Sequence, residues 1–371
     1  MKKVDYYISC GGTGGHFYPG LSIARELQKQ DRGVKLLLSG VNSAAQSQAA
    51  AAQEITSVVL PHMPSPGKNP LRLLQFLAGL AGGFIITFFH FCFNRPRGVI
   101  IMGSFASAPA ALAAKVLFVD IFLHDGNARV GKANRILSRW AKALCTAFPA
   151  VNQTRCRRQA VCTGMPVRPE LEARCAISKS EAVSLLNKEF QSVLSADRYT
   201  ILIFGGSQGA ATLNKILPAA LQELEGFCFQ VIHLTGKGKK AETLPLYEKV
   251  SFPALVLESS PLMELFLGSA DLVFSRSGGS SVAELALFGK NAVLIPYPYA
   301  AEGHQADNAA FYVQSGAGET VSDKEFTKER ASEILTRHLS DPSLGKKREE
   351  AAKKAAFPQA AAAFLKHIEN L

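Results

Sequence analysis

Two glycine-rich stretches determine the expected fold: ISCGGTGGH at residues 8–16 and LIFGGSQGA at residues 202–210. Each follows a short apolar run and precedes a segment with helical periodicity, which is typical of a strand, a tight glycine loop and a helix. Because both halves of the chain open in this way, we expect two Rossmann-like domains, in which ligands bind at the carboxyl ends of parallel strands.

Apolar runs alternate with helix-like runs along the rest of both halves. The first half contains VDYYISC, KLLLSG, GVIIMG and VDIFLHD, and the second contains YTILIFG, FQVIHLTG, ALVLES, ADLVFSRSG and NAVLIPYP. Continuous apolar strands separated by helices predict an α/β protein with parallel sheets covered on both faces. We place a first domain at 1–166, a second at 167–345, and a C-terminal helical segment at 346–371 that packs back on the first domain.

The composition excludes several classes of protein. Of 371 residues, 47% are hydrophobic and 19% are charged, which is the usage of globular rather than disordered or fibrous chains. The seven cysteines form no CxxC pair, so neither a disulfide framework nor a structural zinc site is expected, and free thiols fit a reducing cytoplasm. Glycines follow the two N-terminal lysines before any long apolar run, so we expect no signal peptide.

The net charge of +11 is unevenly distributed. Residues 1–170 carry 20 Lys and Arg against seven Asp and Glu, a net charge of +13, whereas residues 171–371 carry 21 against 23, a net charge of −2. No helix-turn-helix, RNA-binding aromatic motif or zinc finger accompanies the basic half, so nucleic acid is not an expected partner. An anionic membrane surface attracts a basic face equally well.

The longest apolar segment is LLQFLAGLAGGFIITFFHFCF at residues 73–93. Its length would suit a transmembrane helix. However, the strands expected at 4–10 and 98–102 belong to one sheet, and a crossing would separate them. We therefore expect a partly exposed apolar patch with a basic rim, which enters the membrane interface without spanning it. The residues of this predicted patch are Arg72, Leu73, Phe76, Leu77, Phe84, Arg95 and Arg97.

Neither opening glycine loop satisfies the dinucleotide pattern G-x-G-x-x-G. The first has Phe17 where the third glycine is required, and the second has Gln208 where the second glycine is required. An NAD-dependent oxidoreductase is therefore disfavoured. Both loops still bring backbone N–H groups to a helix N-terminus, which suits a phosphate or a sugar hydroxyl, although a tight turn without a ligand would have the same sequence.

A third loop, RSGGSSVAE at residues 276–284, follows the apolar run ADLVF. Ser280 or Ser281 is the expected N-cap of the next helix. The first-turn amides and the helix dipole would stabilise a pyrophosphate without a metal. Glu284 lies about one turn further on, where its carboxylate could accept from both hydroxyls of a ribose, but a glutamate there is also ordinary capping chemistry.

Four segments in this order, GGTGGHFYPGLSIARELQ, GGSQGAATLN, RSGGSSVAE and IPYPYAAEGHQADNA, make the whole chain resemble the MurG family. This resemblance implies the GT-B fold, with two Rossmann-like domains facing across a cleft. It implies inverting transfer of N-acetylglucosamine from UDP-N-acetylglucosamine to the MurNAc 4-hydroxyl of undecaprenyl-pyrophosphoryl-MurNAc-pentapeptide, which converts lipid I into lipid II for peptidoglycan. It also implies a peripheral position on the cytoplasmic face of the bacterial inner membrane, with anionic lipids and other cell-wall synthesis proteins as partners. No cofactor and no metal in the site are expected.

The resemblance also assigns roles to individual residues. Ser207 and the Gly279–Val282 turn would hold the pyrophosphate, Glu284 the ribose, the backbone of Ser260 the uracil, and Gln305 the sugar hydroxyls. The full donor set implied is Ser207, Ser260, Gly279, Ser280, Ser281, Val282, Ala283, Glu284, His304, Gln305 and Asn308. On the sugar and acceptor side it implies Thr13, Gly14, Gly15, Asn127 and Arg168.

His16 ends the first glycine loop and is our expected general base. The attacking sugar hydroxyl is a poor nucleophile unless its proton leaves during the attack, and an imidazole is suited to taking it. A purely orienting role for His16 in the glycine turn is the alternative. Asp125 is the second candidate base.

Three segments on the acceptor side depart from the family pattern. The family's HEQN segment is here HDGN, with Gly126 in place of Gln. The GNPVR junction has Met165 in place of Asn, and the GGY loop is Gly103-Ser104-Phe105. A related GT-B transferase that glycosylates another membrane lipid, such as diacylglycerol, therefore stays open as an alternative. A non-catalytic membrane module that binds UDP-sugars is another.

Overall fold

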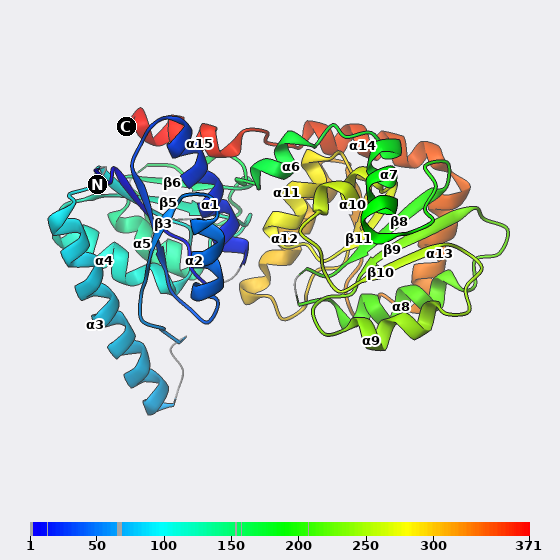
Figure 1. Ribbon diagram of the computed structural model, residues 1–371, viewed down its shortest axis with the longest axis horizontal. Helices are drawn as coiled ribbons and strands as arrows, with labels where there is room; N and C mark the ends of the chain where they lie inside the picture. The colour runs from blue at the N-terminus through cyan, green and yellow to red at the C-terminus, as the bar shows by residue number, and fades with distance from the viewer. Residues whose placement is uncertain (1–2, 13, 65–68, 153, 157, 207) are drawn as a thin grey trace. The chain divides into compact units, whose positions relative to one another are not determined.

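Two parallel sheets, each in its own unit, organise the computed structural model of the chain (Figure 1). The first unit comprises Met1–Arg168 and Gln359–Leu371, and the second comprises Pro169–Pro358. The structure describes residues 3–12, 14–64, 69–152, 154–156, 158–206 and 208–371. The expected α/β fold with two Rossmann-like domains is confirmed.

In the described part of the first unit, seven parallel strands form one sheet in the order β3-β2-β1-β4-β5-β6-β7. Their bounds are β1 (Tyr6–Ser9), β2 (Val34–Leu38), β3 (Thr56–Val59), β4 (Gly98–Ile101), β5 (Asp120–Asp125), β6 (Ala143–Thr146) and β7 (Val161–Cys162). The helices are α1 (Gly14–Lys29), α2 (Ser43–Ala51), α3 (Pro70–Phe93), α4 (Ala108–Val116), α5 (Lys132–Leu137) and α15 (Ala360–Glu369), with the short helices η1 (Phe105–Ser107) and η2 (Ser138–Trp140).

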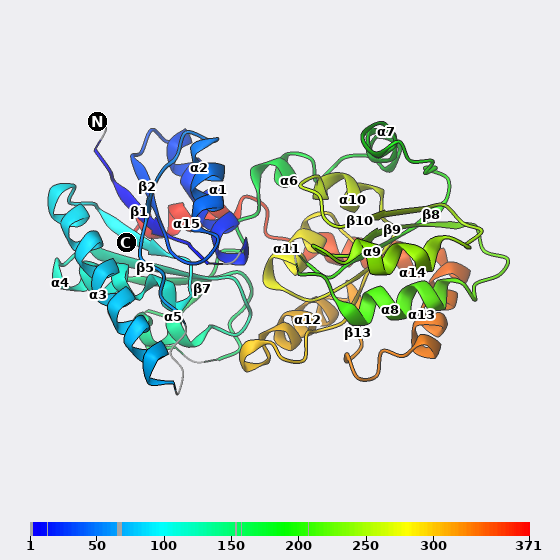
Figure 2. The same cartoon turned by 60° about the horizontal axis from the view of Figure 1, so that its bottom comes forward.

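Alternation along the strands explains why both faces of this sheet are covered. Ile8 of β1 belongs to a core cluster with residues of α1 and α15, whereas its neighbour Tyr7 belongs to a second cluster with residues of α3, α4 and α5. Successive side chains of a strand point to opposite faces, so a continuous apolar strand needs helices on both sides. Figure 2 shows the sheet between these two groups of helices.

The described part of the second unit has six parallel strands in the order β10-β9-β8-β11-β12-β13. They are β8 (Tyr199–Phe204), β9 (Phe229–Leu234), β10 (Ala254–Leu257), β11 (Leu272–Ser275), β12 (Ala292–Leu294) and β13 (Gly318–Thr320). The helices are α6 (Pro169–Ala173), α7 (Lys179–Phe190), α8 (Ala211–Leu221), α9 (Lys240–Thr243), α10 (Met263–Ser269), α11 (Gly279–Leu287), α12 (His304–Gln314), α13 (Lys328–Ser340) and α14 (Pro342–Lys354), with η3 (Leu244–Tyr247) and η4 (Ala301–Gly303).

The C-terminal segment expected at 346–371 is divided between the two units, so that boundary was wrong. Helix α14 stays with the second unit, where the Lys353 side chain packs on Gly289 just beyond α11. Helix α15 instead buries Phe364 and Leu365 in the core of the first unit. The division falls at Pro358, which interrupts the helical run, and the other unit boundary lies after Arg168 rather than after Pro166.

Helix α3 is long and apolar enough to cross a membrane, yet only 22% of its most apolar window is buried. It connects β3 to β4, which lie in the same sheet, and its buried residues Gly79, Gly83, Thr87 and Phe91 all lie in its second and third thirds. The N-terminal part of α3 extends away from the rest of the unit in Figure 1. The leucines before Gly79 are exposed. We call residues Leu71–Ala78 the α3 tip.

The predicted basic rim around this helix is wrong in its arrangement. Because α3 is one continuous helix that ends at Phe93, about 32 Å of helix separates Arg72 from the end near Arg95. Arg97 is engaged elsewhere, with Nε 3.6 Å from an oxygen of Asp5. Of the predicted patch, Leu73 and Leu77 are exposed at the tip, whereas Phe84 packs against the core and against Phe88.

Candidate functional site

The strand order creates one topological switch point in each unit, where connections leave neighbouring strands toward opposite faces of the sheet. The switch point lies between β1 and β4 in the first unit and between β8 and β11 in the second. The loops GGTGGH and GGSQG follow β1 and β8, and the loops at Gly103 and Arg276 follow β4 and β11. The carboxyl ends of strands at a switch point are where open α/β sheets bind ligands.

His16 lies at the switch point of the first unit, in the first turn of α1. A Cβ on Gly103 would lie 3.3 Å from both Cδ2 and Nε2 of the His16 ring and 3.5 Å from Nδ2 of Asn134. The half-buried imidazole therefore contacts the loop after β4, and a side chain at position 103 would displace it. Gly14 and Gly15 are exposed in the same helical turn, and Thr13 lies outside the described residues.

Asp125, at the end of β5, has both carboxylate oxygens engaged. One oxygen accepts from the backbone N–H and side-chain amide of Asn127, at 3.1 and 3.4 Å. The other accepts from the Gly131 N–H at 2.8 Å and the Asn134 amide at 2.9 Å. Asp125 as a whole is 4% exposed. These contacts favour a role in shaping the loop 126–131 over proton transfer, and they bring Asn134 toward His16.

His124 links β5 to Gly164, which lies four residues before Arg168, where the N-terminal segment of the first unit ends. Its Nε2 donates to the Gly164 carbonyl at 2.9 Å, which fixes the hydrogen on Nε2 because a carbonyl oxygen only accepts. Burial lowers the pKa of His124, so the ring stays neutral. Its ring also contacts Phe364 of α15 edge to face. This histidine is a structural residue of the first unit.

Ser104 follows β4 in a backbone conformation that glycine normally occupies, with φ 70° and ψ 147°. Non-glycine residues in this region carry strain of about 1–3 kcal/mol. Its hydroxyl accepts from the Ala106 N–H at 3.3 Å, which caps the following short helix. The backbone of this loop therefore has a conformation typical of glycine at position 104, although the residue is a serine. Ser104 directly follows Gly103, which contacts His16.

Two of the departures from the family pattern contact each other. A Cβ on Gly126 would lie 2.9 Å from Cε and 3.4 Å from Sδ of Met165, which is buried. The methionine thus occupies space that a side chain at position 126 would need. Nearby, the Ser22 hydroxyl donates to the Val167 carbonyl at 2.7 Å, and the guanidinium of Arg168 lies 5.4 Å from the Tyr18 ring centroid.

In the second unit, α11 begins at Gly279 with Gly278 as its N-cap and without a side-chain cap. The expectation of a Ser280 or Ser281 N-cap was wrong, because both serines lie inside the first turn. An uncapped first turn leaves backbone N–H groups and the positive end of the helix dipole available to an anion.

The other residues predicted around α11 differ in their exposure. Ser280, Ser281, Ala283 and Glu284 are half-buried. Val282 is fully buried and its N–H donates to the Gly278 carbonyl, so it serves the core and the helix. Ser207 lies outside the described residues.

Gln305 is oriented by a backbone group. Its side-chain oxygen accepts from the Tyr297 N–H at 2.9 Å, so the amide nitrogen is the free end of the side chain and offers donors only. The neighbouring His304 is half-buried, and its Nδ1 donates to the Ala301 carbonyl at 2.8 Å. Asn308 is fully buried and donates to the Ser277 carbonyl at 3.0 Å, which favours a structural role for it.

Ser260 follows β10, and its hydroxyl accepts from the Leu262 N–H at 3.2 Å. The sequence reasoning overlooked Arg276, which joins the ends of three strands. Its NH1 donates to the Ile295 carbonyl at 3.1 Å and to Asp323 at 2.5 Å. The Ser277 hydroxyl also donates to the Gln305 carbonyl at 2.8 Å. Arg276 and Ser277 belong to the quoted RSGGSS motif, which was the available signal.

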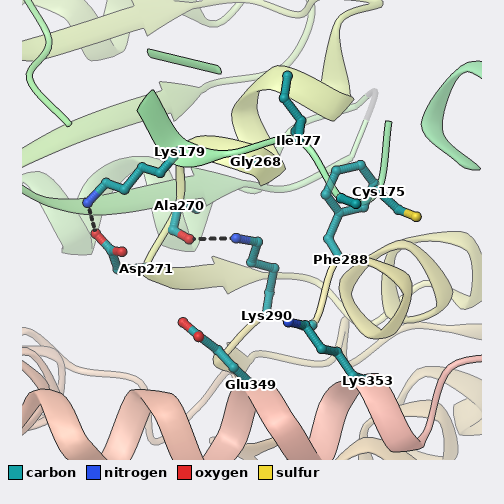
Figure 3. A pocket seen from close by; sticks show the side chains of 12 residues that line it. Cys175, Ile177, Lys179, Gly268, Ala270, Asp271, Phe288, Lys290, Glu349 and Lys353 are labelled. Carbon is teal, nitrogen blue, oxygen red and sulfur yellow. Dashed lines mark hydrogen bonds and ion pairs between the residues drawn. The ribbon is translucent and has the colours of Figure 1, made fainter. Parts of the chain in front are cut away.

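A cavity of about 250 Å³ lies elsewhere in the second unit, at the amino ends of β11 and β12 (Figure 3). Lys179 is ion-paired with Asp271 at 2.5 Å, and Lys290 donates to the Ala270 carbonyl at 2.9 Å. Burial lowers the pKa of Lys290 and raises that of Glu349. Because this edge of the sheet is opposite the glycine loops, the cavity is not part of the candidate site.

No group of three or more His, Cys, Asp or Glu suited to a metal ion occurs among the residues that the structure describes. Among the described residues, the candidates for binding phosphate are the backbone amides at the N-termini of the helices that follow the glycine loops.

Two Rossmann-like units with glycine loops at their switch points fit the GT-B architecture, and two family models show that the chain is a glycosyltransferase. Residues 6–146 match the glycosyltransferase family 28 N-terminal domain, and residues 200–367 match the family 28 C-terminal domain. The UDP-N-acetylglucosamine–N-acetylmuramyl-(pentapeptide) pyrophosphoryl-undecaprenol N-acetylglucosamine transferase of Hahella chejuensis is 32% identical over 99% of this chain and 98% of its own length. The chain therefore belongs to the MurG family within glycosyltransferase family 28.

Further similarities agree with this assignment. The transferase of the same name from Brucella anthropi is 31% identical over 97% of this chain and 93% of its own length. The crystal structure of Acinetobacter baumannii MurG matches with a TM-score of 0.78 and 25% identity, covering 100% of both chains. UDP-GlcNAc 2-epimerase from Neisseria meningitidis, bound to UDP-GlcNAc, shares the fold, with a TM-score of 0.70, 13% identity, and coverage of 99% of this chain and 100% of that one.

Replacing Ser104 with Gly should stabilise the protein by about 1 kcal/mol, because release of backbone strain exceeds the entropic cost of a glycine. Denaturant unfolding would measure the change. The control is Ser43→Gly at the start of α2, where φ is not positive and no gain is expected. Loss of stability in Ser104→Gly would contradict the strain argument.

Replacing Gly126 with Gln should cost about 1–3 kcal/mol through overpacking against Met165. Adding Met165→Asn, which shortens the side chain that is in the way, should make the double variant lose at least about 1 kcal/mol less than the sum of the two single losses. Unfolding free energies of the two single variants and the double variant would measure this coupling. Additive losses would show that the two substitutions are independent.

Proposed function

We propose that the chain transfers N-acetylglucosamine from UDP-N-acetylglucosamine to the 4-hydroxyl of MurNAc in undecaprenyl-pyrophosphoryl-MurNAc-pentapeptide, with inversion at the anomeric carbon and without a metal in the site. The observation that carries the proposal is the location of the loops of four ordered motifs at the carboxyl ends of strands, in a chain that its transferase relatives match over almost its whole length.

On the donor side, the uncapped N-terminus of α11 supports a pyrophosphate site. We propose that amides of the Gly279–Ser281 turn bind the diphosphate together with Ser207, that Glu284 binds the ribose, and that the backbone at Ser260 binds uracil. Gln305 would donate to the sugar hydroxyls through its amide nitrogen, because the Tyr297 N–H already holds its side-chain oxygen. When UDP departs, the helix N-terminus stabilises the charge that develops on the leaving phosphate.

On the acceptor side, we propose His16 as the general base. His16 removes the proton of the MurNAc 4-hydroxyl while that oxygen attacks C1 of N-acetylglucosamine from the face opposite UDP. The bond between C1 and the phosphate oxygen breaks, and its electron pair leaves with UDP. Asp125, with four donors on its carboxylate, would hold Asn127 and Asn134 in place around the base.

The second candidate is transfer to a different membrane lipid. The specific observation that favours it is the group of departures on the acceptor side, namely Ser104 and the contacting pair Gly126 and Met165. The donor and the reaction would be the same in both cases, so only the acceptor distinguishes them.

We further propose that the α3 tip holds the enzyme on the cytoplasmic face of the bacterial inner membrane as a peripheral protein. The support is its exposed apolar surface, since Leu71, Leu74 and Leu77 are 61%, 64% and 50% exposed. The α3 tip extends beyond the loop at His62, which follows β3. It therefore lies on the same side as the carboxyl ends of the strands. Anionic lipids would add attraction to the basic first half of the chain.

The function is tested by UDP release from UDP-N-acetylglucosamine with and without a short-chain lipid I analogue. We expect release that depends on the analogue, and a decrease of about 10²- to 10⁴-fold in turnover in His16→Ala with little change in UDP-N-acetylglucosamine affinity. His367→Ala on α15 is the control and should keep normal turnover. Donor binding without analogue-dependent release would favour another lipid acceptor, and equal losses of turnover and donor affinity in His16→Ala would assign His16 an orienting role.

The tip is tested by binding to vesicles of phosphatidylethanolamine and phosphatidylglycerol. Leu73→Gln combined with Leu77→Gln should weaken binding at least about tenfold, since each leucine that enters the apolar phase contributes about 1.5–3 kcal/mol. Phe93→Gln combined with Phe118→Gln is the matched control, because these side chains are 83% and 87% exposed but lie outside the tip. Equal effects of the two pairs would contradict a specific role of the tip.

A further inference from the structure

Three buried polar side chains form a chain of hydrogen bonds in the core of the second unit. His233, on β9, is fully buried, and Tyr247 of η3 and Asn214 of α8 are 7% and 8% exposed. His233 Nδ1 lies 2.9 Å from the Tyr247 hydroxyl, and Nε2 lies 3.0 Å from the Asn214 side-chain oxygen. The Asn214 amide nitrogen in turn lies 2.9 Å from the Thr235 carbonyl oxygen. Polar groups in an apolar core are costly unless they are bonded in this way.

The donor and the acceptor of each of these hydrogen bonds follow from the last group in the series, the Thr235 carbonyl. A carbonyl oxygen only accepts, so Asn214 must present its nitrogen to Thr235 and its oxygen to His233. His233 Nε2 must therefore carry a hydrogen. Burial lowers the pKa of His233 to about 3, so the ring is neutral, and its Nδ1 accepts from the Tyr247 hydroxyl. The three side chains therefore have one arrangement of donors and acceptors, in which each hydrogen bond is donated in the direction from Tyr247 to the Thr235 carbonyl.

The last member of this series of hydrogen bonds, the Thr235 carbonyl, supports the glycine loop after β8. A Cβ on Gly209 would overlap the Thr235 carbonyl oxygen, and a Cβ on Gly236 would overlap the backbone of Gly209. The loop therefore lies directly on the backbone of Thr235 and Gly236. The same two residues are bonded through their N–H groups to the carbonyls of Leu257 and Glu258, at 2.9 and 2.8 Å, just before Ser260.

We propose that His233 is a positioning residue for the donor diphosphate, because it orients Asn214 so that the Thr235 carbonyl holds the GGSQG loop in its phosphate-binding path. This inference rests on the proposed function, in which that loop binds the diphosphate of UDP. Removal of His233 frees the Asn214 amide to rotate and leaves its oxygen without the donor that oriented it. The Thr235 carbonyl then loses its fixed partner, and the glycine loop above it loses its support.

The test compares affinities for UDP and for uridine, measured by calorimetric titration of the full chain. A residue that positions the phosphate loop should change the affinity for UDP and leave that for uridine nearly unchanged. We expect His233→Phe and Asn214→Leu each to lower the ratio of UDP to uridine affinity at least about fivefold. Tyr247→Phe removes only the first hydroxyl and should lower the ratio by about two- to threefold.

Gln230→Leu is the matched control. Gln230 is also fully buried on β9, but it bonds Ser195 and Thr200 at the other end of the strand. This variant should lower the melting temperature without changing the ratio. An unchanged ratio in folded His233→Phe and Asn214→Leu, or in Tyr247→Phe if those two do not fold, would overturn the inference. Absence of UDP binding by the unaltered chain would instead overturn the proposed function on which it rests.

Discussion

The parallel pairing of β1 with β4, and of β8 with β11, is the constraint on which the rest of the structure depends. Connections leave these neighbouring strands toward opposite faces of the sheet, so their loops separate and leave backbone amides accessible at the strand ends. In the first unit this brings the ring of His16 against Gly103. In the second unit it leaves the N-terminus of α11 next to the loop after β8. The candidate chemistry is built from this arrangement.

The elements around these loops fix side chains that a ligand would need in one orientation. The Tyr297 N–H orients Gln305, the Gly164 carbonyl fixes the tautomer of His124, and Asp125 gathers four donors around the loop 126–131. In each case a backbone group or a loop donor decides the orientation, because its own donor or acceptor character leaves no choice. Such support gives the site its geometry before any substrate binds.

The sequence alone was sufficient for the two-domain α/β fold, because glycine loops and apolar strands are local patterns. For the same reason it located His16 and the RSGGSS turn in the segments that follow strands, while their roles stay predictions. It failed where contacts join distant residues. Arg95 and Arg97 were grouped with Arg72 although α3 places them at its opposite ends, and no local pattern indicated the hydrogen bonds of His233 with Tyr247 and Asn214, which lie on other elements. The pairing of Gly126 with Met165 was likewise visible only in three dimensions.

The proposal that the second unit binds the donor is tested most directly by a crystal structure of the protein with UDP-N-acetylglucosamine. We expect diphosphate oxygens within hydrogen-bond distance, about 2.7–3.2 Å, of backbone nitrogens in the Gly279–Ser281 turn, with Gln305 donating to the sugar. A diphosphate bound instead at the Gly14–His16 turn of the first unit would contradict it, because donor and acceptor sides would then be exchanged.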